Sequence, residues 1–253
     1  MEFSASAYNF AMADNAKAEL APRGVLRAAI NMGNSLLVTG KTATGDPDGV
    51  SPDMAREIAN RLGVGVQFVP FASPGELADA AANDAWDIGL IAEEPERAEV
   101  MSFTPAYVEI EATYLVPAGS KFKSLEEVDS PGTRIAVSAR AAYDLYLTRT
   151  LKHATLVRGK GIAGTFDMFV KDGLDAMAGL RPGLIEDAAK LPGARVIDGR
   201  FTAVQQAIGT KRGNAAGAKF LRDFVAEAKS SGLVAKLIDR HGVRGRLSVA
   251  PPA

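Results

Sequence analysis

The sequence predicts an α/β protein of two lobes, each a mostly parallel sheet flanked by helices, with two crossings between the lobes. Strand and helix patterns alternate over residues 25–91 and again over residues 134–197. This order implies parallel strands joined by crossover helices. Extended runs at residues 111–116 and 203–208 flank the second alternating region. We interpret both runs as crossings between the lobes.

The two extended runs set the expected domain boundaries. We place lobe 1 at residues 21–113 together with 210–253, and lobe 2 at residues 114–209. Residues 1–20 form an N-terminal extension. The C-terminal helices, expected over residues 215–240, should pack back on lobe 1.

In lobe 1, a strand at residues 25–30 is followed by a polar, Gly-rich loop and a well-marked helix. Ser51 can cap this helix, Pro52 suits its first turn and Gly63 ends it. A strand at residues 66–69 comes next. The cycle then repeats, with a helix opened by Ser73 and running to residue 81, and a buried strand at residues 87–91.

Lobe 2 begins near Ser124, which has the spacing of a capping box with Glu127. The elements expected after it are strands at 134–137, 156–157, 175–178 and 195–197 and helices at 141–151, 165–170 and 182–190. Two helices at 215–230 and 233–240 close the chain. Residues 248–253 are expected to be a frayed tail.

Composition excludes several classes of function. The 253 residues are 47% hydrophobic, enough for a sizeable core. Charge is balanced, with 29 Lys and Arg against 30 Asp and Glu, so nothing favours nucleic acid or an anionic membrane as partner. No stretch approaches the ~20 apolar residues of a membrane span, so we expect no membrane insertion.

Cysteine and histidine usage restricts the chemistry further. The chain has no cysteine, which excludes disulfides, thiolate nucleophiles and Cys-based zinc sites. Its two histidines, His153 and His241, are expected at the surface, and we assign neither a catalytic role. We expect no metal, no cofactor and no catalytic residue.

Three stretches carry a family resemblance. Residues 49–70 combine Gly, an acidic apolar helix, Leu-Gly-Val and a strand ending in Pro; residues 86–107 include Trp-Asp-Ile, Glu-Pro-Glu-Arg and Phe-Thr-Pro-Ala-Tyr; residues 173–177 read Gly-Leu-Asp-Ala-Met. In this order they resemble the amino-acid-type periplasmic solute-binding proteins of ABC transporters, family 3. The resemblance covers residues 24–242.

The resemblance implies a type II periplasmic-binding fold, with a ligand cleft between two lobes that close about a hinge. It also implies a small-molecule ligand, a membrane permease of an ABC transporter as partner, a periplasmic location and a monomer. Residues 1–20 lack the basic and apolar regions of a signal peptide. Either a signal peptide has been removed and Met1 added, or the protein stays in the cytosol; the resemblance favours the first.

Arg97 matches the family arginine that pairs with a ligand carboxylate, a task suited to the guanidinium fork. Its alternative is a surface ion pair with Glu94 or Glu96. Glu94 stands where the family usually has Thr, and it can either neutralise Arg97 or meet a donor on the ligand. Ala92 and Glu93, just before it, are included as ligand contacts.

In lobe 2, Ser138, Arg140 and Ala141 form a turn between a strand and a helix. Free backbone N–H groups at such a turn bind anions, and the family binds the ligand carboxylate there. Arg140 can add a cationic contact or point to solvent. Tyr143, one turn later, can face the cleft, although packing within the lobe is favoured.

Leu180 is the main departure from the family pattern. The family carries at this position an Asp that pairs with a ligand α-ammonium, and a leucine cannot neutralise an ammonium. Arg181 can present positive charge to the cleft or remain a solvated residue before Pro182. The predicted ligand is therefore polar or anionic and not an ordinary α-amino acid, unless Glu93 or Glu94 replaces the missing Asp.

The other candidates have structural alternatives. Phe71 can cover the ligand or belong to the core. Asn31 and Asn34 lie where α/β clefts form, but they are also turn formers. Thr165 can be a helix cap, which is favoured, or a cleft hydroxyl.

Two other functions compete with transport. Some relatives are dehydratases acting on cyclic prephenate-like acids, and Glu93 or Glu94 could supply the acid or base. A ligand-sensing module of a receptor is the third possibility, weakened because the chain has no membrane span or signalling domain.

Overall fold

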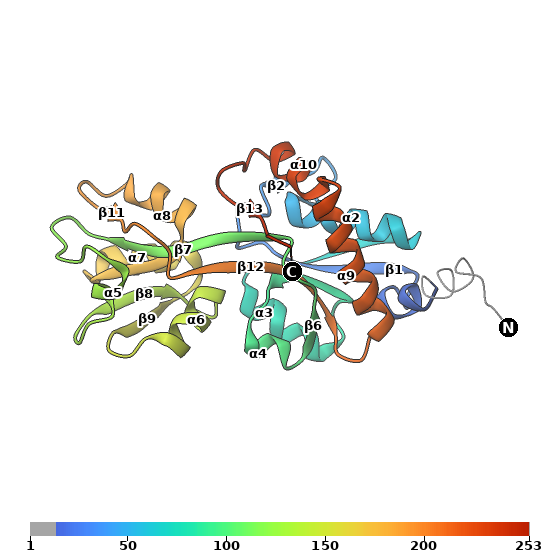
Figure 1. Ribbon diagram of the computed structural model, residues 1–253, viewed down its shortest axis with the longest axis horizontal. Helices are drawn as coiled ribbons and strands as arrows, with labels where there is room; N and C mark the ends of the chain where they lie inside the picture. The colour runs from blue at the N-terminus through green and yellow to red at the C-terminus, as the bar shows by residue number, and fades with distance from the viewer. Residues whose placement is uncertain (1–13, 253) are drawn as a thin grey trace. The chain divides into compact units, whose positions relative to one another are not determined.

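The computed structural model describes residues 14–252, so most of the predicted extension at residues 1–20 lies outside the described part. Residues 14–20 are helical, and Ala16 and Leu20 are fully buried. The chain forms two compact units (Figure 1). Unit 1 comprises residues up to Val108 and from Gln205 onwards, and unit 2 comprises Glu109–Val204. Within the described residues, no helix is both long and apolar enough to cross a membrane.

The sheet of unit 1 is built around β1 (Val25–Asn31). β4 (Gly65–Phe71) and β5 (Ile88–Ala92) pair with it in parallel, one on each side. β12 (Thr202–Lys211) pairs antiparallel with β5 and with β6 (Met101–Phe103). The parallel part thus follows the predicted alternation of strands and helices.

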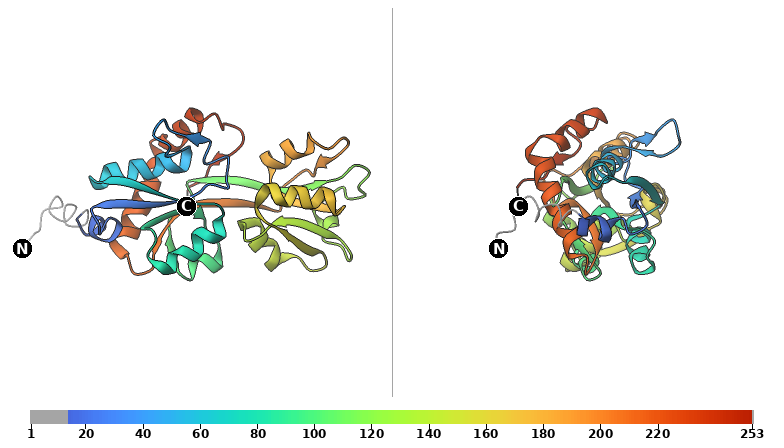
Figure 2. Two further views of the ribbon diagram at one scale, coloured as in Figure 1. Left: turned by 180° about the vertical axis from the view of Figure 1, so that it is seen from behind. Right: turned by 90° about the vertical axis from the view of Figure 1, so that its right-hand side faces the viewer.

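Helices α2 (Val50–Leu62), α3 (Pro74–Asp79) and α4 (Pro95–Ala98) connect these strands, with a 3₁₀ turn, η1 (Ala80–Asn83), after α3. α9 (Ala215–Ser230) and α10 (Leu233–Arg240) also belong to unit 1, where α10 contacts both α9 and α2 (Figure 2). A two-stranded hairpin, β2 (Gly40–Lys41) and β3 (Pro47–Asp48), precedes α2.

The strands of unit 2 are arranged around β8. β8 (Arg134–Ser138) pairs in parallel with β9 (Thr155–Gly159) and with β10 (Ala176–Leu180). β7 (Val108–Val116) adds antiparallel to β10 and to β11 (Arg195–Val196). The helices are α5 (Leu125–Val128), α6 (Ala142–Thr150), α7 (Gly161–Lys171) and α8 (Arg181–Ala188).

The chain passes between the units inside two strands. The first passage, at residues 108 and 109, lies in β7, and the second, at residues 204 and 205, lies in β12. The predicted boundaries, after residues 113 and 209, fall in the same strands but further along the chain. A continuous extended segment therefore carries each passage.

The predicted start of α2 is wrong, and the capping box predicted at Ser124 does not form, although Ser124 is the N-cap of α5 as expected. α2 begins at Val50, with Gly49 at its N-cap, and Ser51 instead hydrogen-bonds the Tyr107 hydroxyl at 2.8 Å. At α5, Ser124 is at the N-cap without a side-chain cap bond. Glu127 accepts from the Lys123 N–H at 2.6 Å, one residue before the expected partner.

Two further expectations are also wrong. Thr165 lies inside α7, which starts at Gly161, and its hydroxyl donates to the Gly161 carbonyl at 2.6 Å. It therefore neither caps the helix nor supplies an exposed hydroxyl. The predicted frayed tail forms β13 (Ser248–Val249), and the buried Ala250 donates its N–H to the Tyr107 carbonyl at 3.1 Å.

Candidate functional site

The predicted site residues of unit 1 gather where parallel strands end. Asn31 and Phe71 are the last residues of β1 and β4 and are directly paired, and Ala92 ends β5. Because β5 also pairs in parallel with β1, the three strand ends share one edge of the sheet. Ligand sites of open α/β sheets form at such an edge.

Two candidates at this edge have structural roles of their own. Asn34 is buried, and its Oδ1 accepts from the Leu36 N–H at 3.1 Å, so this side chain shapes the loop after β1. Phe71 is half-buried and packs against the core cluster that contains Trp86. Asn31 accepts from the Gly33 N–H at 3.1 Å. The turn-forming and core alternatives are thus realised at these positions.

Arg97 is buried, with 4% of its surface exposed, so it is not the surface residue of the alternative interpretation. Its Nη1 donates to the Ala92 carbonyl at 2.7 Å. This bond fixes the guanidinium against the carboxyl end of β5. Glu94, at the N-cap of α4, is also buried, whereas Glu93 is exposed and donates its N–H to the Gln205 carbonyl at 3.0 Å.

The predicted anion-binding turn of unit 2 spans residues 138–141, between β8 and α6. Its backbone N–H groups have partners within the unit: Ala139 donates to the Gly159 carbonyl at 3.0 Å, Arg140 to Asp144 at 2.7 Å and Ala141 to the Ser138 carbonyl at 3.2 Å. The expectation of free N–H groups at these three residues is therefore wrong. The first-turn N–H groups of α6 that follow have no acceptor inside the helix.

Tyr143 is buried beside the turn. Burial raises the pKa of its hydroxyl well above the usual value, although a hydrogen bond with Ser138 acts in the opposite direction. The hydroxyl is therefore neutral at physiological pH. Its burial and its bond to Ser138 match the favoured interpretation, in which Tyr143 packs within the lobe.

Leu180 ends β10 and is the N-cap residue of α8, so it stands at a strand end like the other candidates. Arg181 follows it and is engaged within unit 2. Its Nε donates to Glu111 of β7 at 2.7 Å, and Nη2 donates to the Gly199 carbonyl. Glu111 also lies 3.7 Å from the guanidinium of Arg200. Arg181 thus ties α8 to β7, and much of its charge is balanced by the chain itself.

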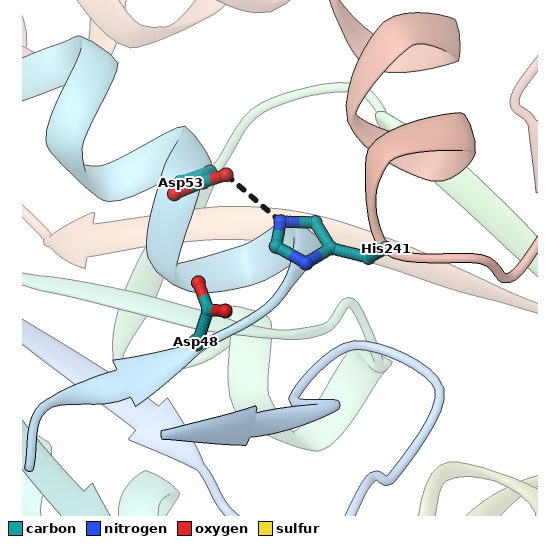
Figure 3. A group of neighbouring side chains, drawn as sticks. All are labelled: Asp48, Asp53 and His241. Atoms are coloured by element: carbon teal, nitrogen blue, oxygen red, sulfur yellow. Dashed lines mark hydrogen bonds and ion pairs between the residues drawn. The ribbon is translucent and has the colours of Figure 1, made fainter. Parts of the chain in front are cut away.

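A second cluster in unit 1 joins Asp48, Asp53 and His241, whose potential metal-ligand atoms lie within 4.8 Å of one another (Figure 3). The His241 side chain is only 6% exposed and its Nε2 lies 2.8 Å from Asp53 Oδ2, so the expectation of a surface position is wrong. Arg56 and Arg240 also bond Asp53, at 2.8 and 3.1 Å.

The charges of this cluster favour a structural role. Burial raises the pKa of Asp53, but hydrogen bonds from His241, Arg56 and Arg240 outweigh it and leave the pKa below 3.8. Two guanidinium groups already balance the two carboxylates. We interpret the cluster as an ion-pair network that joins β3, α2 and the end of α10.

Unit 2 also contains a cavity of about 620 Å³. It is bordered by the loop at residues 117–122, the end of α7 and the loop at residues 191–194. None of the predicted site residues lines it. The cavity is therefore separate from the ligand site that the sequence predicts.

A family model for the bacterial extracellular solute-binding proteins, family 3, matches residues 34–244. Among curated proteins, none matches the sequence. A mutant of ArgBP from T. maritima shares the fold at a TM-score of 0.73 and 22% identity, covering 90% of this chain and 99% of that one.

Two further solved structures are similar. One is a putative binding component of an ABC transporter from Wolinella succinogenes complexed with lysine, with TM-score 0.72, 23% identity and coverage of 86% and 95%. The other is the ancestral amino acid-binding protein AncCDT-1, described as a precursor of cyclohexadienyl dehydratase, with TM-score 0.71, 25% identity and coverage of 88% and 97%. These matches confirm the predicted two-lobed type II fold.

Proposed function

Because the chain belongs to family 3 of the bacterial extracellular solute-binding proteins, we propose that it is the binding receptor of an ABC importer. In this proposal its lobes close on a small solute, which it delivers to a membrane permease. The family match over residues 34–244 and the ABC transporter component among the similar structures support this role. We further propose a periplasmic location and a monomeric state, and no catalysis.

We propose that the ligand is a small polar or anionic organic solute rather than an ordinary α-amino acid. The observation that carries this is Leu180, an apolar residue at the end of β10, where the family resemblance expects an Asp for the ligand ammonium. Burying an ammonium without a counter-charge is costly. For a negatively charged ligand group the situation differs, because Arg97 places a buried guanidinium at a strand end, where it can pair with a carboxylate.

ArgBP from T. maritima has an arginine-bound form, and the W. succinogenes protein is complexed with lysine, so amino acids must be tested directly. A thermal-shift screen against the twenty L-amino acids and a panel of mono- and dicarboxylates is the first experiment, because a ligand of the native state raises the unfolding temperature. Calorimetry then gives affinities. We expect a carboxylate to bind; micromolar binding of any common α-amino acid would refute the proposed ligand class.

Leu180→Asp tests the residue on which the ligand class depends. The new carboxylate should weaken binding of a carboxylate ligand at least tenfold, because like charges repel in a partly desolvated site. Ile185→Asp is the matched control: it adds the same charge to the exposed side of α8 and should leave affinity within about twofold. Equal changes of affinity in both variants would show that Leu180 does not lie at the ligand site.

The second candidate function is a dehydratase acting on a prephenate-like acid. The likeness to AncCDT-1 and the exposed carboxylate of Glu93, directly after β5, favour it. An enzyme of this kind needs a positioned acid or base. Turnover of such an acid that disappears in Glu93→Gln or Glu94→Gln would establish this function and overturn the binding-only proposal.

A further inference from the structure

Arg140 adopts a backbone conformation that is unusual for a residue with a Cβ atom. Its φ is 61°, in the left-handed region, and it lies in the turn between β8 and α6. Such a conformation is costly for residues other than Gly and persists only where surrounding contacts impose it. The contacts of this turn therefore have to hold Arg140 in place.

Asp144 supplies one of these contacts from the first turn of α6. Its Oδ2 accepts from the Arg140 N–H at 2.7 Å, so a carboxylate four residues ahead closes the turn. Only 2% of Asp144 is exposed. A carboxylate buried to this extent is unfavourable unless it is paired and hydrogen-bonded.

Arg158 provides the pairing. Its Nε lies 3.0 and 3.1 Å from the two Asp144 oxygens, and its Nη2 lies 3.0 Å from Oδ1. The side chain of Arg158 is 44% exposed, so it reaches the buried carboxylate from the surface. The next residue of β9, Gly159, accepts the Ala139 N–H at 3.0 Å. β9 thus holds the turn at two points, through a carbonyl and through the Asp144 carboxylate.

We propose that Asp144 and Arg158 are positioning residues, which act through the turn at residues 138–141 to set its ligand-binding shape. The inference rests on the proposed function, because it assumes that this turn meets the ligand. The inference also changes which N–H groups of unit 2 bind the ligand carboxylate. The Arg140 N–H is committed to an internal carboxylate, so a ligand carboxylate is bound by the first-turn N–H groups of α6 from Ala142 onwards and not by that donor.

Hydrogen exchange by NMR tests the positioning role without a ligand. In Asp144→Ala, the Arg140 amide should exchange at least tenfold faster, while the amides of β8 and α7 stay protected. Thr148→Ala is the control, because the Thr148 hydroxyl also bonds Asp144 and Arg158 but does not touch the turn. It should leave the Arg140 amide unchanged. Unchanged exchange in Asp144→Ala, or equal loosening of the whole unit, would overturn the proposal.

Arg158→Met is a second variant in case Asp144→Ala does not fold. It keeps the carboxylate but removes its partner, and it should speed exchange at Arg140 by a smaller factor in the same pattern. Protection at Arg140 equal to that of the parent protein would contradict the pairing step.

A binding measurement connects the turn to the ligand. With L-arginine, L-glutamine, succinate and citrate as probes, whichever binds the parent protein should bind Asp144→Ala at least tenfold more weakly and Thr148→Ala within threefold. Faster exchange at Arg140 without loss of affinity would overturn the proposal that the turn contributes to ligand binding. If only L-arginine or L-glutamine binds the parent protein, the proposed ligand class fails, while the exchange experiment still decides whether Asp144 positions the turn.

Discussion

At the scale of single residues, the ion pair between Arg27 and Asp87 shows how unit 1 accommodates charge inside its sheet. Arg27 lies within β1, and its Nη2 is 2.7 Å from Asp87 Oδ1; both residues are buried. Asp87 Oδ2 also accepts from the Arg27 backbone N–H at 2.9 Å. Hydrogen bonding to Asp87 raises the pKa of Arg27 despite the opposing effect of burial.

We predict that Asp87→Asn lowers the free energy of unfolding by about 3 kcal/mol, because it leaves a buried guanidinium without its main counter-charge. Denaturant unfolding measures the loss. Asp223→Asn is the control, since the Asp223–Lys219 pair on α9 is exposed and its removal should cost less than about 0.5 kcal/mol. Similar losses in both variants would contradict this assignment of the buried pair.

At the scale of elements, the two glycines at the ends of α2 have different constraints. Gly49, at the N-cap, has φ 149°, and a Cβ there would lie 2.3 Å from the Leu37 carbonyl oxygen. Gly63, at the C-cap, is left-handed at φ 63°, but a Cβ there would meet only the end of the Lys17 side chain, at 4.0 Å. Both positions favour glycine, but only Gly49 also requires the absence of a side chain.

Gly49→Ala should therefore destabilise the protein by about 3 kcal/mol or more, since backbone atoms have to move. Gly63→Ala should cost about 1 kcal/mol, the strain of a left-handed alanine. Thermal unfolding of both variants checks the order. An equal or smaller loss of stability in Gly49→Ala would show that the loop at Leu37 can move at little cost in free energy.

The network around Asp53, which joins α2, β3 and α10, predicts a dependence on pH. The pKa of Asp53 is lowered in the folded protein, so the unfolded chain binds its proton more readily. This contribution to stability is complete above pH 3.8 and is lost as the pH falls through the lower pKa of the folded state. Asp53→Asn should flatten the acid limb of a stability–pH curve below pH 3.8; an unchanged acid limb would contradict it.

At the scale of the whole molecule, each unit has its own core, although unit 1 is assembled from both ends of the chain. Leu237 of α10 is buried in unit 1, next to α2 and α9. Leu184 of α8 belongs to a separate core cluster in unit 2 with Phe169 and Met177. Every member of the Leu184 cluster lies in unit 2.

We predict that Leu237→Ala and Leu184→Ala each cost about 2–5 kcal/mol, but in different units. Hydrogen exchange followed by mass spectrometry should show lost protection in α2 and α9 for Leu237→Ala, and in α7 and β10 for Leu184→Ala. Loss of protection throughout both units in either variant would indicate that the molecule unfolds as one cooperative body.

The sequence by itself determined the order of the elements, because apolar periodicity and helix-ending residues act locally. The alternation of strands and helices predicted parallel pairing, and each unit has parallel strands, around β1 in unit 1 and around β8 in unit 2. The residue at position 180 is likewise a fact of the sequence, but the strand predicted at residues 175–178 stopped short of it, whereas β10 ends at Leu180. The same local signals predicted the two extended runs, which lie within β7 and β12.

Only the tertiary structure decided which polar groups are engaged. Arg181 is bonded to Glu111, which is 70 residues away, and the side chain of His241 lies against Asp53, which is 188 residues away. No local sequence pattern predicts such partners. The sequence predicted free backbone N–H groups in the turn at residues 138–141. In the structure, the Gly159 carbonyl on the neighbouring strand and the buried Asp144 carboxylate accept hydrogen bonds from two of these groups. A buried donor or charge must find a partner wherever the fold brings one, and that choice depends on distances in space that local sequence patterns do not contain.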